Sequence, residues 1–111
     1  MALAAERLVP TFQELYERIR QLPEGVTGEI LEPGVIRTMS RPNRRHARVL
    51  KFSTWSLRDF DVDLTGQGWW ILVEHEIKLP DERLVVPDIA GWRVERVSEL
   101  SEENPLTVMP D

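Results

Sequence analysis

The sequence contains no cysteine among its 111 residues, which excludes disulfide bonds and thiolate metal sites. No apolar run approaches the roughly 20 residues that are needed to cross a bilayer. The apolar stretch at the amino terminus is interrupted by Glu6 and Arg7, so no signal peptide is predicted. A soluble protein of the reducing cytoplasm is the simplest expectation.

Several enzyme motifs are missing as well. The sequence has no nucleophile elbow, no phosphate-binding loop and no dinucleotide fingerprint. Its two histidines, His46 and His75, do not form a zinc-binding pattern. No linker, internal repeat or low-complexity tract divides the chain, whose length suits one small core. We therefore expect a single domain over residues 1–111.

Acidic residues outnumber basic ones and give a formal net charge of −5, which argues against a protein that mainly coats nucleic acid. Basic residues nevertheless gather locally, at Arg41, Arg44, Arg45, Arg48 and Lys51. Near the start of a helix, such a cluster could bind phosphates through Arg44, Arg45 and Arg48. The alternative is a solvated helix face, which is the commoner role of such clusters.

Two helices and a hairpin are predicted in the first half of the chain. Thr11 and Glu14 have the spacing of a capping box, and the apolar residues that follow predict a helix over residues 11–22. The stretch "TGEILEPGVIRTMS" predicts a β-hairpin that turns at Pro33-Gly34. A second helix is expected from Pro42, with an apolar stripe that comprises His46, Val49, Leu50, Ser53 and Leu57. On that stripe, His46 is expected to be a packed histidine rather than a metal ligand.

Two antiparallel strands are predicted in the second half, after a loop over residues 59–68. The first is "WWILVEHEIKL", and the second returns over residues 83–90 after a turn at Pro80-Asp81. The final "LTVMPD" has the apolar pattern of the approach to a further strand.

Asp88 is the most unusual residue of the second strand, because a carboxylate inside an apolar strand needs a hydrogen bond, an ion pair or a cation. Pro87-Asp88 could simply begin a turn or cap a backbone amide. Alternatively, Asp88 could converge with Glu29, Glu74 or Glu76, and a divalent cation such as Mg²⁺ or Mn²⁺ would then offset the repulsion between carboxylates. Glu74 and Glu76 could equally form the solvated face of an edge strand.

The stretches "RPNRRH", "GWWILVEHEIKL" and "VPDIAGWRVER" occur in an order and spacing that resemble the Uma-two-type restriction endonuclease family. This family is a branch of the PD-D/E-x-K nuclease-like fold, and the resemblance extends from "TGEILEP" to the final "MPD". It implies an α/β, restriction-endonuclease-like fold with a mixed sheet flanked by helices. It also implies a metal-dependent phosphodiesterase site that acts on DNA with Mg²⁺ or Mn²⁺.

Within this resemblance, Asp88 corresponds to the first metal-binding carboxylate, and Glu29 corresponds to the auxiliary catalytic acid. Glu74 is a supporting candidate for metal binding. The family's next strand follows a "PD" like Pro110-Asp111 and carries the second carboxylate and the lysine of the E-x-K element. The sequence stops at Asp111, so we expect a partial, C-terminally truncated domain that is inactive on its own.

A function of a different class is also open. A catalytically silent domain could act as a binding or oligomerisation module, through Trp69, Trp70 and the edge of an unfinished sheet. A homo-oligomer is the expected state in that case.

Overall fold

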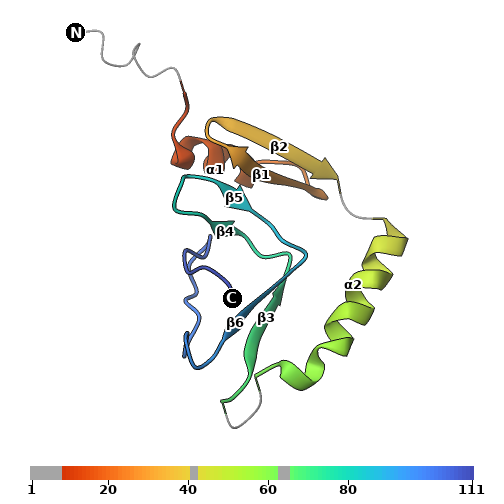
Figure 1. Ribbon diagram of the computed structural model, residues 1–111. Coiled ribbons are helices and arrows are strands. Elements are labelled where there is room, and N and C mark those ends of the chain that lie inside the picture. Colours follow the sequence, from red (N-terminus) through yellow and green to blue (C-terminus); the bar gives the residue numbers. More distant parts are fainter. Residues whose placement is uncertain (1–8, 41–42, 63–65) are drawn as a thin grey trace, which may run out of the picture.

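The computed structural model describes residues 9–40, 43–62 and 66–111, which form two small sheets and two α-helices (Figure 1). One sheet has four strands in the order β2-β1-β5-β4, and the other pairs β3 with β6. All pairings between these strands are antiparallel, and the described residues also form two isolated parallel bridges, Asp61 with Trp69 and Ile77 with Leu106. No helix in the described parts of the chain is both long and apolar enough to cross a membrane.

The first helix forms as predicted. Helix α1 spans Phe12–Arg20, and Thr11 and Glu14 form the capping box that their spacing indicated. Its apolar face buries Leu15, Tyr16 and Ile19 in a core shared with strands β1 and β5. This core holds α1 against strands β1 and β5.

The predicted hairpin is also present. Strand β1 spans Val26–Glu32 and pairs with β2, which spans Val35–Ser40. Gly34 has a φ of +86° at the turn, a conformation that glycine adopts without a steric penalty. On its other side β1 pairs with β5, so it lies inside the four-stranded sheet. Glu29 therefore projects from a central strand rather than from an edge.

Helix α2 spans Arg44–Ser56 and is followed by the short 3-10 helix η2, Arg58–Phe60. Pro42 lies outside the described residues, and the helix is capped by the Asn43 side chain, which accepts a hydrogen bond from the His46 amide at 2.9 Å. No residue of α2 is buried, so the expectation that its apolar stripe enters the core is wrong. The stripe is only half-buried, and 60% of Val49 is exposed.

The two long strands predicted in the second half are each broken in the middle. The first divides into β3 (Trp69–Val73) and β4 (Ile77–Lys78), and the second divides into β5 (Leu84–Val85) and β6 (Ile89–Arg93). At each break the chain crosses from one sheet to the other, as Figure 1 shows. Glu74 and Glu76 lie at the first break, so they do not share a strand face, and Asp88 lies at the second. The predicted antiparallel pairing is confirmed for β3 with β6 and for β4 with β5.

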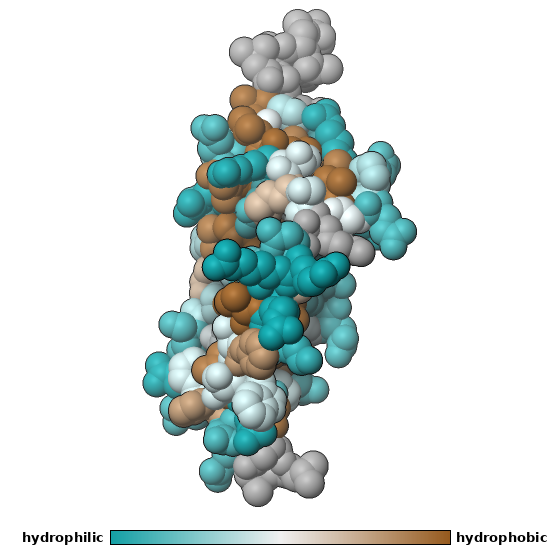
Figure 2. All heavy atoms as spheres, turned by 90° about the vertical axis from the view of Figure 1, so that its right-hand side faces the viewer, coloured by the Kyte–Doolittle hydropathy of each residue, from teal (hydrophilic) through white to brown (hydrophobic). Residues whose placement is uncertain are grey.

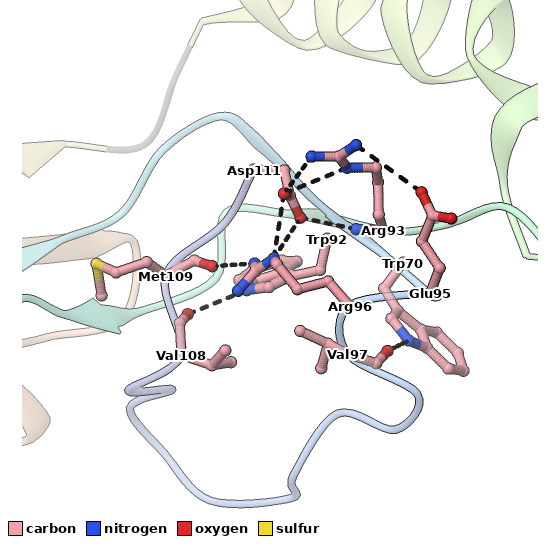
Figure 3. Close-up of polar contacts among 9 residues, drawn as sticks. All are labelled: Trp70, Trp92, Arg93, Glu95, Arg96, Val97, Val108, Met109 and Asp111. Atoms are coloured by element: carbon pink, nitrogen blue, oxygen red, sulfur yellow. Dashed lines mark hydrogen bonds and ion pairs between the residues drawn. The ribbon is translucent and has the colours of Figure 1, made fainter.

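A second core forms around Trp92, which is fully buried with Ile77, Ala90 and Leu106. Two tryptophan side chains are hydrogen-bonded to the last part of the chain. The indole N–H of the half-buried Trp70 donates a hydrogen bond to the Val97 carbonyl, and that of the buried Trp92 donates one to the Val108 carbonyl (Figure 3). The predicted further strand is reduced to the bridge between Leu106 and Ile77. The indole anchors hold the last part of the chain against the second core.

Asp111 lies on the outer edge of β6. Its amide donates to the Gly91 carbonyl at 2.8 Å, and its carboxylate contacts Arg93 and Arg96 (Figure 3). The hydrogen bond from the Arg93 amide is the main cause that lowers the pKa of the Asp111 carboxyl group below its usual value, and the two guanidinium groups add to it. Asp111 thus covers part of the sheet edge through which the sequence predicted oligomerisation.

Candidate metal centre

Three side chains from separate parts of the sequence converge where the two sheets meet. One nitrogen of His46 and one carboxylate oxygen each of Glu74 and Asp88 lie within 4.8 Å of one another. His46 comes from the first turn of α2, Glu74 from the β3–β4 break and Asp88 from the β5–β6 break. We refer to these three residues as the acid–histidine cluster.

The positions of the cluster residues follow from local structure. Asn43 fixes the start of α2 and thereby places His46 on the side of the helix that faces the sheets. Glu74 has a φ of 49°, a left-handed conformation that costs a non-glycine residue roughly 1–2 kcal/mol. Its amide donates to the Asp88 carbonyl at 3.1 Å, so the two breaks are held side by side. The strand breaks that the sequence did not predict are therefore what assembles the cluster.

His46 is not the packed core histidine that the sequence predicted. Its Nε2 atom lies 3.2 Å from Oδ1 of Asp88 and is shielded from solvent, yet it has no hydrogen-bond partner among the described residues. The two atoms are close without the alignment of a hydrogen bond. Ligands on adjacent corners of an octahedron with metal–ligand distances of about 2.1 Å also lie about 3 Å apart. The pair thus has the spacing of two ligands that face one ion.

Asp88 is more accessible than its sequence context predicted. It lies in a bend outside the strands, and 64% of its side chain is exposed. The need to compensate a buried charge therefore does not explain its position. Its carboxylate faces His46. The alternative that Pro87-Asp88 simply begins a turn therefore explains the bend in the backbone but not the direction of the Asp88 side chain.

Glu29 lies outside the cluster but is connected to it through the backbone. Its Oε2 atom accepts a hydrogen bond from the Val86 amide at 2.7 Å, two residues before Asp88. Glu76, at the other break, accepts a hydrogen bond from the Tyr16 hydroxyl at 2.7 Å. Of the three glutamates that could converge with Asp88, the structure places Glu74 beside it and directs Glu29 and Glu76 to other partners.

Two neighbouring cavities flank the cluster. One, of about 380 Å³, is lined by all three cluster residues, with Asn43 and Ser40 among the others. The second, of about 580 Å³, contains Tyr16 and Glu76. Both are lined by Thr27, Glu74 and Val86, so they meet at these residues. The carboxylates of Glu74 and Asp88 are therefore open to a ligand from solvent, while the Nε2 atom of His46 lies shielded beside them.

Two basic residues of α2, Arg44 and Arg48, face away from the cluster. Arg44 and Arg48 are each two positions from His46, which is about half a turn of an α-helix. Both side chains and that of Arg45 are exposed, and none of the three forms an ion pair with another described residue. Arg41 lies outside the described residues. Arg44 and Arg48 of the predicted phosphate-binding patch are thus placed on the opposite side of the helix from His46, and Arg45, one position from His46, lies about a quarter of a turn away.

Tyr16 provides a direct test of the packing beside the second cavity. Burial, followed by the hydrogen bond to Glu76, raises the pKa of Tyr16 from 10.0 to about 12. The folded state favours the protonated phenol of Tyr16. Its contribution to the stability of the protein is therefore complete below pH 10 and is lost as the pH rises towards 12. We expect the free energy of unfolding to fall by on the order of 2 kcal/mol across this range.

Because Tyr16 is the only tyrosine, its phenolate absorbance reports this titration directly. Urea unfolding across the same pH range measures the stability, and Tyr16→Phe is the control, since it removes this contribution while other groups still titrate. Equal pH dependence of the two proteins would contradict the assignment.

No family model and no curated protein matches the sequence. The structure is similar to a crystal structure described as that of "a putative nuclease belonging to DUF820" from Anabaena variabilis ATCC 29413. The TM-score is 0.61 and the sequence identity is 22%. The match covers 89% of this chain and 50% of the other, so the chain spans about half the length of that protein. The similarity confirms the predicted restriction-endonuclease-like α/β fold.

Proposed function

We propose that the chain forms part of a nuclease domain that hydrolyses phosphodiester bonds of DNA with a bound divalent metal ion. The observation that carries the proposal is the convergence of His46, Glu74 and Asp88 within 4.8 Å. It is supported by the fold, which is similar to that of a protein described as a nuclease, and by the family resemblance of the sequence. A DNA substrate and the absence of cysteine both favour the cytoplasm.

The donor set of the cluster fits a divalent metal ion. Two carboxylates and one imidazole supply both charge and a nitrogen ligand, and no residue within 9–40, 43–62 or 66–111 competes for the His46 Nε2 atom with a hydrogen bond. Mg²⁺ prefers an all-oxygen shell, whereas Mn²⁺ and later transition metals accept imidazole more readily. We therefore favour Mn²⁺ over Mg²⁺. A bound ion of this kind would polarise the phosphate and lower the pKa of a bound water.

Each residue near the cluster then has a definite role. Asp88, Glu74 and His46 would hold the ion, and imidazole must be neutral to do so. Glu29 would be a positioning residue, because its carboxylate fixes the Val86 amide and hence the turn that presents Asp88. The Arg44, Arg45 and Arg48 side chains would bind phosphates elsewhere on the nucleic acid.

One part of the family's catalytic apparatus is not supplied by these residues. No lysine follows Lys78 in the sequence, so no E-x-K element lies beyond Asp88. The second carboxylate and the lysine would have to come from another segment or another chain. Metal binding and hydrolysis are therefore separate questions for this polypeptide, and metal binding is the more direct test.

Calorimetric titration with Mn²⁺ tests the proposed ligands. We expect weak binding, because three protein ligands leave about half of a six-ligand shell to water. Asp88→Asn, Glu74→Gln and His46→Gln should each reduce the affinity about tenfold or more. Mg²⁺ should bind more weakly than Mn²⁺, and it should be less affected by His46→Gln.

Glu29→Gln is the matched control. It removes a nearby carboxylate charge, yet the amide oxygen can still accept the hydrogen bond from Val86. Mn²⁺ affinity should stay within about threefold of the parent, given that the proposed ligand set is intact. Equal affinity of the parent and Asp88→Asn would remove Asp88 from the site and refute the proposal.

A further inference from the structure

The outer face of α2, opposite His46, has a composition that the candidate metal centre does not explain. Arg45, Arg48, Phe52 and Trp55 follow one another at intervals of three, four and three residues, so they form one stripe along the helix. Figure 2 looks onto this side of the molecule and shows hydrophilic and hydrophobic residues interleaved over it. We refer to these four residues as the α2 stripe.

The aromatic members of the stripe are exposed to an unusual degree. The exposed fractions are 52% for Phe52 and 60% for Trp55, although large aromatic side chains are usually buried well beyond this. Each ring is accompanied by a guanidinium group, with Arg48 positioned 5.4 Å from the centre of the Phe52 ring and Arg58 4.6 Å from that of Trp55. An aromatic surface is thus presented to solvent beside positive charge.

The charge of this segment is opposite to that of the whole chain. Residues 43–60 contain five cationic side chains and one carboxylate, Asp59, whereas the whole chain carries a net charge of −5. The local excess favours an anionic ligand. Its combination with exposed rings favours an anion that also carries planar groups able to stack.

Single-stranded nucleic acid has this chemistry. Its phosphates attract arginine, and its unpaired bases stack on aromatic side chains without regard to sequence. Phe52 and Trp55 lie three residues apart on one helix face, a separation of about 5–6 Å between their Cβ atoms that suits neighbouring bases. Duplex DNA keeps its bases stacked inside the helix, so it offers this stripe phosphates but no free base face on which Phe52 and Trp55 could stack.

An anionic membrane surface matches the stripe less well. Interfacial helices insert a broad apolar face, whereas Leu50 and Leu57 of this segment are half-buried, and Leu57 lines a cavity together with Trp69 of the sheet. The outward face offers two aromatic rings among arginines instead.

We propose that the α2 stripe binds single-stranded nucleic acid through base stacking on Phe52 and Trp55 and phosphate contacts from Arg45 and Arg48. In its choice of partner this inference rests on the proposed nuclease function, and it extends that function by naming a substrate with unpaired bases. The stripe lies on the opposite side of α2 from the candidate metal centre, so a strand would reach both only by passing around the helix. The stripe is accordingly a holding surface rather than part of the cleavage site.

The test measures binding of oligo-dT by the 111-residue chain at low salt in the presence of EDTA. Exposed Trp55 fluorescence should be quenched, and the matching duplex should bind more weakly and with less quenching. Phe52→Leu and Trp55→Leu should each reduce affinity for the single strand about tenfold and leave duplex binding unchanged. Replacing Arg44, Arg45 and Arg48 by Gln should weaken both and reduce the salt dependence. An oligo-U arm distinguishes RNA from DNA.

Phe60→Leu is the matched control, because 57% of Phe60 is exposed but it lies outside the stripe, in η2. Its affinity should equal that of the parent. The inference is overturned if Phe52→Leu and Trp55→Leu bind the single strand as the parent does, or if the stripe proves to mediate self-association and no strand binding occurs. Because EDTA removes metal ions, failure here does not bear on metal binding, and loss of metal binding by Asp88→Asn does not bear on the stripe.

Discussion

The 111-residue chain, purified alone, is expected to leave DNA uncut in the presence of Mn²⁺ or Mg²⁺. Stabilisation of charge at the scissile phosphate by a firmly held ion and by a nearby lysine typically contributes several kcal/mol each to the transition state. These residues offer three ligands for an ion but no lysine beyond Lys78. The rate should therefore be at least about a thousandfold below that of a domain with both elements.

The measurement is a plasmid-nicking assay with and without metal ions. The positive control is a longer chain in which a Glu-x-Lys strand from a complete relative follows Asp111. Cleavage should appear in that chain and disappear with Asp88→Asn. Metal-dependent cleavage by the 111-residue chain itself, abolished by Asp88→Asn, would contradict the prediction. It would also indicate that another residue, or a second copy of the chain, replaces the lysine.

The parts of the fold that the sequence predicted well are those determined by local interactions. Helix α1 has a capping box at Thr11 and an apolar period that fits no other structure. The hairpin has Pro33-Gly34 at its turn between two strand-forming runs. In each case the signal lies within a few residues of the element it specifies.

The strand breaks could not be predicted in this way. Because both faces of a strand can become buried, an apolar run that leaves one sheet and enters another reads as one continuous strand. The identity of Glu74 does not indicate the strand break, because a left-handed conformation is rare for glutamate. Here the pairing of the two breaks imposes that conformation. Tertiary contacts therefore determine the feature that assembles the candidate site.

Only part of the candidate site could be predicted from the sequence, because tertiary contacts also determine which side chains meet there. Asp88 and Glu74 were identified by their chemistry and by the family resemblance, and they do lie together. His46 was assigned to the core because a helix stripe that faces a cavity has the same period as one that faces a core. The cap at Asn43 was the one local signal that could have placed His46 in the exposed first turn of α2.

Replacement of Trp92 by alanine is expected to destabilise the protein most among single substitutions. Trp92 is fully buried and packs with Ile77, Ala90 and Leu106. Removal of a buried tryptophan costs about 3–5 kcal/mol through lost transfer free energy and the cavity that remains. It would also leave the Val108 carbonyl without the indole donor. Because small domains have total stabilities near the lower end of about 5–15 kcal/mol, much of the protein should unfold.

Trp55→Ala is the matched control, because the same atoms are removed from a side chain that is 60% exposed. We expect the free energy of unfolding, measured by urea denaturation, to change by less than about 1 kcal/mol in that variant. Since β6 begins at Ile89, next to Asp88, Trp92→Ala should also lose Mn²⁺ binding, whereas Trp55→Ala should retain it. Similar stability of the two variants would mean that the second core does not hold β6, and that the acid–histidine cluster is positioned by the Glu29–Val86 and Glu74–Asp88 hydrogen bonds alone.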